Sequence, residues 1–188
     1  AVDEIVREVR QDGDAAVSSA LERLDHVTCP PERLRVRPEE FARARRLVDG
    51  SVVEAIRVGI ANIRAYNEHV IAHASWRAEI APGIEAGERA GPIDAAGLFV
   101  PSGKGSFPSV LMQIGTPAVA AGVPTIAVLV PPARGSLDVD PAVLVVAQEL
   151  GLENVFRVNG PAGIAAVAFG TETIPRVSRV VGPGSPAV

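Results

Sequence analysis

The sequence predicts an α/β fold in its second half, with parallel strands joined by crossover helices. Four short apolar runs begin at residues 96, 125, 154 and 179, and this spacing suits repeated strand–helix–strand units. The runs are nearly all apolar, as expected of strands buried on both faces. A glycine-rich loop follows each run, and in a parallel sheet these loops share the carboxyl edge, where open α/β sheets bind ligands. The predicted strands are Ala96–Val100, Thr125–Val130, Asn154–Val158 and Arg179–Val181.

The first part of the chain has helical periodicity. Residues 2–24 carry apolar positions at helical spacing, interrupted where Gly13 favours a helix stop and Asp14 an N-cap for the next helix. Pro30-Pro31 breaks the chain, and Arg37-Pro38 opens another helix. A long amphipathic helix is predicted over Ser51–His73. Its expected apolar stripe is Val52, Ala55, Ile56, Ile60, Ile63 and Tyr66.

Between the helices and the α/β region, alternating residues punctuated by Pro82-Gly83 predict one or two short strands, or a hairpin, over residues 76–91. We therefore divide the chain into a helical amino-terminal segment with a strand or hairpin region, residues 1–92, and an α/β region, residues 93–188. The expected crossover helices are Val110–Ala121, Pro141–Leu150 and Ala162–Phe169.

Composition limits the function classes. The chain has 188 residues, of which 47% are apolar and 21% charged, so it can bury a substantial core. A net charge of −4 without a basic tract argues against a nucleic-acid partner, and no uninterrupted apolar stretch predicts a membrane span. The single Cys29 excludes an internal disulfide and a cysteine-based zinc site, and a cytoplasmic setting is expected. Because the sequence starts directly with helical periodicity and stops after a Gly-Pro-Gly turn, we expect a fragment of a longer protein.

Three of the loops suggest binding without proving it. The loop 101–106 places glycines, hydroxyls and Lys104 between a strand and a helix, a composition that suits an anion, although it matches neither a Walker loop nor G-x-G-x-x-G. The loops 159–163 and 182–185 would let a flat cofactor approach the backbone. Each loop taken singly is better explained as a tight turn, whereas their shared position at one sheet edge favours a site.

Candidate catalytic side chains are few. His69 and His73 are four residues apart on one predicted helix, so a metal pair is conceivable, but a surface helix explains them better. Glu172 is a candidate acid or base, and a loop-capping role is the stronger interpretation. No Ser/His/Asp or Cys/His set can be assembled.

At these loops the chain resembles histidinol dehydrogenase, and the resemblance extends over nearly the whole sequence. The motifs that carry it are the segments 97–103, 107–112, 116–118, 121–123, 131–132, 164–175 and 181–184, with 9–10, 13–16 and 62–63 upstream. The combined pattern is specific, whereas each piece by itself is not. The resemblance implies an α/β fold with a helical amino-terminal segment followed by an incomplete Rossmann-like parallel sheet with crossover helices.

The resemblance also implies an activity: NAD-dependent oxidation of the amino alcohol L-histidinol through an aldehyde to L-histidine, by a zinc-dependent homodimer. It places the family's zinc ligands and catalytic Glu-His pair beyond Val188, so no catalytic or metal residue is expected in this chain, which we expect to be inactive in isolation.

The cofactor-binding positions that the resemblance assigns depart from the family pattern. Phe99 stands where the family has tyrosine, Ala162 where it has glutamine and Ser185 where it has asparagine. We expect Phe99 to pack against the dinucleotide, Lys104 to approach a phosphate and Ser185 to bond a ribose or amide. The three changes suggest a divergent relative. They also support an alternative: a non-catalytic small-molecule-binding or oligomerising α/β domain that kept the fold and lost the chemistry.

Overall fold

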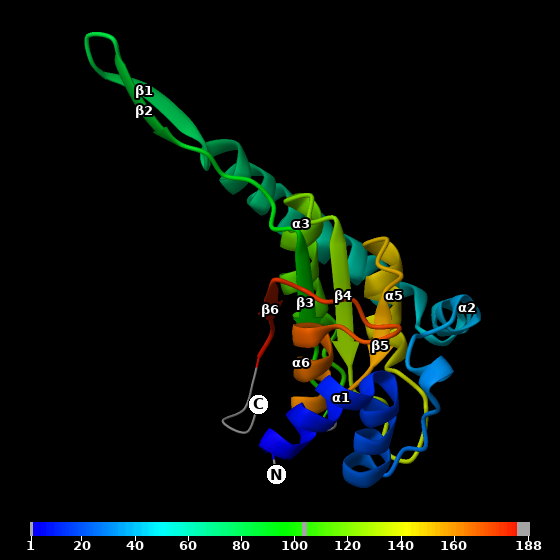
Figure 1. Cartoon of the computed structure of the whole chain (residues 1–188). Helices are drawn as coiled ribbons and strands as arrows, with labels where there is room; N and C mark the ends of the chain where they lie inside the picture. Colours follow the sequence, from blue (N-terminus) through cyan, green and yellow to red (C-terminus); the bar gives the residue numbers. More distant parts are fainter. Residues whose placement is uncertain (1, 103–104, 184–188) are drawn as a thin grey trace.

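The second half of the chain forms a four-stranded parallel sheet, as the sequence predicted (Figure 1). In the computed structural model, which describes residues 2–102 and 105–183, the strand order is β5-β4-β3-β6. Strand β3 pairs in parallel with β4 on one side and with β6 on the other, and β4 pairs in parallel with β5. The strands are β3 (Ala95–Phe99), β4 (Thr125–Val130), β5 (Val155–Arg157) and β6 (Arg179–Val181).

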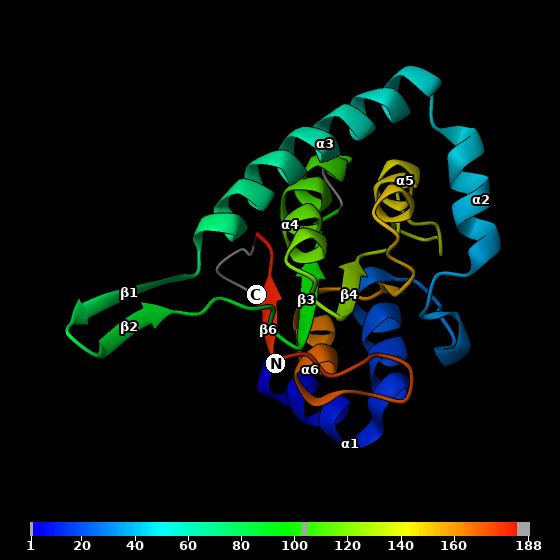
Figure 2. The same cartoon turned by 90° about the horizontal axis from the view of Figure 1, so that it is seen from above.

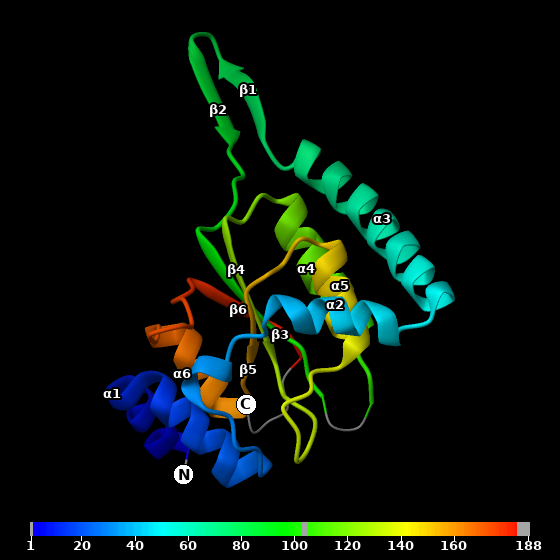
Figure 3. The same cartoon turned by 90° about the vertical axis from the view of Figure 1, so that its right-hand side faces the viewer.

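Helices cover both faces of this sheet (Figures 2 and 3). One face carries α4 and α5 with the earlier helices α2 and α3, around a core that includes Leu98, Leu111 and Val146. The other face carries α6 with α1, around a core that includes Val17, Phe99 and Ala166. The helices are α1 (Val2–Ala20), α2 (Pro38–Leu47), α3 (Gly50–His73), α4 (Pro108–Ala120), α5 (Pro141–Glu149) and α6 (Gly160–Phe169).

The amino-terminal residues also cover one edge of the sheet. Two short turns of helix, η1 (Leu21–Asp25) and η2 (Pro31–Arg33), follow α1. The chain after η2 then runs antiparallel to β5, where the Val36 N–H donates to the Val155 carbonyl at 2.8 Å and the Arg157 N–H donates to the Leu34 carbonyl at 2.7 Å. Residues before 93 therefore share both cores and one edge with the α/β region.

The buried face of α3 differs from the predicted stripe. Val53, Ile56 and Ile60 are the buried residues of α3. Val52 is 42% and Tyr66 71% exposed, and Ala55 is exposed as well, so the prediction for these three was wrong. The adjacent valines at 52 and 53 are compatible with either of two helix faces being buried. The packing of α3 on α4 decides that the face with Val53 is buried. Beyond Ile60 the helix leaves the body of the protein, so Ile63 is half-buried and the apolar residues of α3 after it are exposed.

A β-hairpin extends from the end of α3 and projects from the body (Figures 1 and 3). It consists of β1 (Trp76–Ala81) and β2 (Ile84–Glu88), paired antiparallel, which confirms the predicted hairpin. Every residue of both strands is exposed. The edge strand β6 is likewise exposed, in contrast to the buried β3, β4 and β5. Within 2–102 and 105–183, no helix is long and apolar enough to span a membrane.

Candidate functional site

The strand order creates a switch point at β3. The chain moves from β3 to β4 and β5 on one side and then returns to place β6 on the other side. The loops after β3 and β6 therefore leave the sheet at the same carboxyl edge, and a switch point of this kind is where open α/β sheets bind ligands. The structure thus brings together two of the loops that the sequence singled out.

Backbone contacts hold this edge closely together. Gly182 follows β6 so near to β3 that a Cβ built on it would overlap the Phe99 carbonyl oxygen and lie 2.9 Å from the Phe99 Cβ. Only glycine fits there without a shift of the backbone. The Ser102 hydroxyl donates to the Pro131 carbonyl at 3.2 Å, so the loops after β3 and β4 are also joined.

The predicted cofactor-binding residues are placed unequally. Phe99 is 6% and Ala162 2% exposed, and both side chains belong to the core between the sheet and α6. Both residues lie near the predicted edge of the sheet, but their side chains are buried in the core and not on the surface. Their contact with a dinucleotide stays a prediction. Lys104 and Ser185 lie outside the described residues.

The start of α6 is fixed by Asn159. Its Oδ1 caps the helix by accepting from the Gly160 N–H at 2.8 Å, and its Nδ2 donates to Asp25 Oδ1 at 2.6 Å. Gly160 has φ of 48°, which favours glycine, and a Cβ there would meet no atom within 4 Å. The side-chain amide of Asn159 is therefore engaged in hydrogen bonds within the protein. The open space at the start of α6 lies next to Gly160.

Glu172 acts as a cap, which was the stronger of the two interpretations of this residue. Its carboxylate accepts from the Asp14 N–H at 2.8 Å, at the point where Gly13 (φ 55°, ψ −130°) breaks α1. That hydrogen bond holds the pKa of Glu172 below its usual value. The interruption at Gly13 was predicted, but the amide of Asp14 is capped by a residue far along the chain. A carboxylate stabilised in its ionised form is a poor proton donor, so the geometry gives no support to an acid role.

The two histidines lie together on the exposed end of α3. The rings of His69 and His73 are 4.4 Å apart between centroids, and Nδ1 of His73 lies 2.8 Å from the His69 carbonyl oxygen. No group of three or more His, Cys, Asp or Glu residues in the described part of the chain is arranged to hold a metal ion.

Sequence reasoning missed a buried arginine at the end of β5. Arg157 has no exposed side-chain surface, and it donates to the carbonyls of Leu137 at 2.6 Å and Arg33 at 2.8 Å. It also contacts the Arg35 carbonyl at 3.3 Å and pairs with Glu40 on α2. Burial lowers the pKa of its guanidinium, and the Glu40 carboxylate opposes that shift. Arg157 thus connects the loop after β4 to the amino-terminal segment by hydrogen bonds. A charged residue in a predicted strand does not by itself indicate that its side chain is buried.

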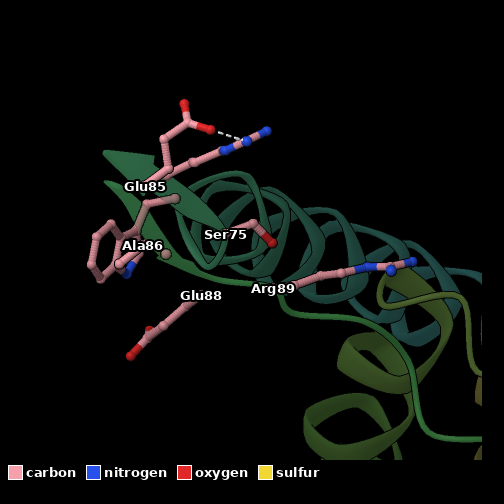
Figure 4. A pocket seen from close by; sticks show the side chains of 8 residues that line it. Ser75, Glu85, Ala86, Glu88 and Arg89 are labelled. Atoms are coloured by element: carbon pink, nitrogen blue, oxygen red, sulfur yellow. Dashed lines mark hydrogen bonds and ion pairs between the residues drawn. The ribbon is translucent and has the colours of Figure 1, made fainter. Parts of the chain in front are cut away.

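The larger hollows of the surface lie away from the carboxyl edge. One of about 570 Å³ lies between the start of α2 and the segment before β5, lined by residues that include Arg35, Phe41 and Glu153. Another of about 490 Å³ lies on the hairpin (Figure 4). Neither contains a residue predicted to bind. We place the candidate site at the carboxyl edge because the strand order, rather than hollow size, defines where ligands bind in this architecture.

The fold and the strand order define a doubly wound α/β protein with a strand-order switch point between β3 and β6. Comparison with known proteins gives the family. The sequence matches the family description "Histidinol dehydrogenase" over residues 1–188, and the chain belongs to the histidinol dehydrogenase family.

Individual relatives agree with this assignment. A "Histidinol dehydrogenase homolog" of Rhizobium meliloti (strain 1021) is 46% identical over 98% of this chain and 40% of the relative. A "Histidinol dehydrogenase" of Thermosynechococcus vestitus is 40% identical over 98% of this chain and 42% of the relative. The crystal structure of histidinol dehydrogenase from Elizabethkingia anophelis superposes with a TM-score of 0.93 at 27% identity, over 100% of this chain and 42% of that one. The chain thus spans about 40% of the length of the curated relatives that it matches.

Proposed function

We propose that this chain supplies a dinucleotide-binding part of an NAD-dependent dehydrogenase that oxidises an amino alcohol, L-histidinol or a close analogue, through an aldehyde to the acid. The observation that carries the proposal is the switch point at β3 and β6 in a chain of the histidinol dehydrogenase family. We place the parent protein in histidine biosynthesis and in the cytoplasm, as a homodimer, on the family resemblance.

Two backbone features at this edge support the proposal of a dinucleotide. Gly182 permits close approach of the chain at the end of β3, and the space above Gly160 is open at the start of α6. When bound, NAD supplies the hydride acceptor. The residues of this chain would bind and orient it: the Phe99 ring from below, Lys104 toward a phosphate, Ser185 toward a ribose or amide, and Ala162 at the first turn of α6.

Zinc does not fit the described residues, because no cluster of potential ligands occurs in 2–102 or 105–183. We therefore derive no step through a metal, and we expect its ligands and the proton-transfer groups in other parts of the parent protein. The isolated chain should accordingly show no histidinol oxidation, with or without added zinc.

A second candidate function is a non-catalytic small-molecule-binding or oligomerising domain. The observation that favours it is the burial of Phe99 and Ala162, together with the loss of the family's tyrosine, glutamine and asparagine side chains. The hydroxyl missing at Phe99, the amide missing at Ala162 and the shorter polar group at Ser185 would weaken NAD binding by about 0.5–1.5 kcal/mol for each hydrogen bond that is lost.

The test is titration calorimetry of NAD into the 188-residue chain and into a triple variant, Phe99→Tyr, Ala162→Gln and Ser185→Asn. The proposal expects measurable binding to the chain, and tighter binding by up to a few kcal/mol in the triple variant. A Phe99→Tyr single variant separates the added hydroxyl from strain caused by glutamine at the buried Ala162 position. Absence of NAD binding by every variant that keeps the wild-type melting temperature would favour the second candidate.

A further inference from the structure

A hollow of about 570 Å³ opens at the opposite edge of the sheet from the candidate site. Its wall is formed by the chain before α2, the first turn of α2 and the turn between α5 and β5. The residues before β5 lie at the amino edge of the parallel sheet, whereas the loops of the candidate site leave the carboxyl edge. The volume lies in the range of about 300–1,000 Å³ that is typical of small-molecule sites.

The chain before α2 is held in place at this hollow by hydrogen bonds. The Val36 N–H donates to a β5 carbonyl at 2.8 Å, and the Arg157 guanidinium donates to the Arg35 carbonyl at 3.3 Å. Val36 is buried in the core, while Arg35 and Arg37, on either side of it in the sequence, are exposed and line the hollow. Two guanidinium groups are therefore presented from one fixed segment, and such preorganisation lowers the cost of binding.

Four charged side chains line the hollow, and they carry both signs. Arg35 and Arg37 are cations, and Glu32 and Glu153 are anions. Although they share one hollow, none of the four has an ion-pair partner among residues 2–102 and 105–183. Guanidinium groups are suited to a carboxylate, and carboxylates to an ammonium group. Because the charges of the lining cancel, the hollow suits a neutral zwitterion better than a multiply charged anion.

The hollow also has an apolar wall. Phe41 is half-buried, and Val36 and Leu152 are buried, with 2% and 7% exposure. Pro38 completes this wall. Apolar side chains combined with a few charged groups are typical of sites that bind small organic molecules, because the apolar part supplies burial and the charges fix the orientation.

We propose that this hollow binds a free α-amino acid with an apolar side chain, such as leucine or phenylalanine. Arg35 and Arg37 hold its carboxylate. Glu32 and Glu153 accept hydrogen bonds from its ammonium group, and its side chain packs on Phe41. The proposal is independent of the proposed function, because the hollow lies at the opposite edge of the sheet from the expected dinucleotide and shares no residue with that site.

The experiment is titration calorimetry of leucine and phenylalanine into the 188-residue chain, with three analogues that each lack one group. N-acetyl-leucine has no ammonium group, leucinamide has no carboxylate, and glycine has no apolar side chain. We expect saturable binding of both amino acids, and at least about tenfold weaker binding of each analogue. Absence of saturable binding, or analogues that bind as tightly as leucine, would overturn the proposal.

Two paired variants test the side chains that hold the ligand. Arg35→Gln with Arg37→Gln should weaken leucine binding at least about tenfold and leave leucinamide binding unchanged, because only leucine has the carboxylate. Glu32→Gln with Glu153→Gln should weaken leucine binding and leave N-acetyl-leucine binding unchanged. Arg46→Gln is the matched control, because Arg46 is exposed on α2 but does not line the hollow.

Retention of leucine binding by both paired variants would also count against the proposal. The four substituted side chains are exposed, and the melting temperature verifies that each variant is folded. If a pair lowers the melting temperature, the analogue series on the wild-type chain still decides the matter. Saturating NAD should leave leucine binding unchanged, whereas competition between the two would place leucine at the carboxyl edge and overturn the proposal.

Discussion

Replacing Arg157 with methionine should cost a large fraction of the stability of the chain. The change removes the ion pair with Glu40 and leaves the carbonyls of Leu137, Arg33 and Arg35 without their donor. Removing one partner of a buried ion pair costs about 3–5 kcal/mol. Two facts lower the expected loss of stability: the Glu40 side chain is 20% exposed, and it still has an ion-pair partner in Arg33 at 3.7 Å. The three carbonyls left without a donor raise the loss. We expect a loss of about 3–5 kcal/mol, against a total of about 5–15 kcal/mol for a typical domain.

Urea unfolding of the wild type, Arg157→Met, Arg157→Lys and Glu40→Gln measures this loss. Lysine should recover little, because a point charge cannot reach the acceptors that the guanidinium fork serves. Glu40→Gln keeps an acceptor but leaves the fully buried guanidinium without its counter-ion, so it should also cost about 3–5 kcal/mol. A cost below about 1 kcal/mol for Arg157→Met would refute the reasoning, because it would mean that the network contributes no more than a surface ion pair.

Further predictions concern single positions. Gly182→Ala should destabilise the chain by about 1–3 kcal/mol through overlap with Phe99, while Gly50→Ala, whose Cβ meets nothing within 4 Å, should not destabilise it in the same urea titration. The pKa of Glu172 is lowered in the fold, so its contribution is present above its unfolded pKa of about 4.3 and is lost as pH falls. Stability of the wild type and of Glu172→Gln, measured from pH 7 to pH 3, should therefore converge at acid pH. Burial raises the pKa of Cys29, so its contribution is lost as pH rises through the folded pKa, and Cys29→Ala should show a smaller alkaline loss above about pH 8.5 in thermal melts.

The periodic features of the fold could be predicted from the sequence. Strand spacing, crossover helices and the hairpin follow from local patterns of apolar residues, glycine and proline. The shared carboxyl edge of the loops followed from the same reasoning, because parallel strands place their following loops together, and the binding site at that edge stays a prediction.

The remaining features depend on distant contacts. The phase of α3 is decided by its packing on α4, and the exposure of β6 by its position at the edge of the sheet. Burial of Arg157 depends on acceptors contributed by residues 33–40 and 137. No local pattern around position 157 records that those groups are present.

The cap on α1 has a consequence for the order of folding. Glu172 lies 158 residues after the amide that it accepts from, and α6, which packs on α1, is also formed late in the sequence. During synthesis from the amino terminus, α1 is complete long before either partner leaves the ribosome. The apolar face of α1 therefore stays exposed to solvent, or is covered by a temporary partner, until the second half of the chain emerges. A helix that is made before α2 to α6 is therefore among the last of these elements to reach its final packing.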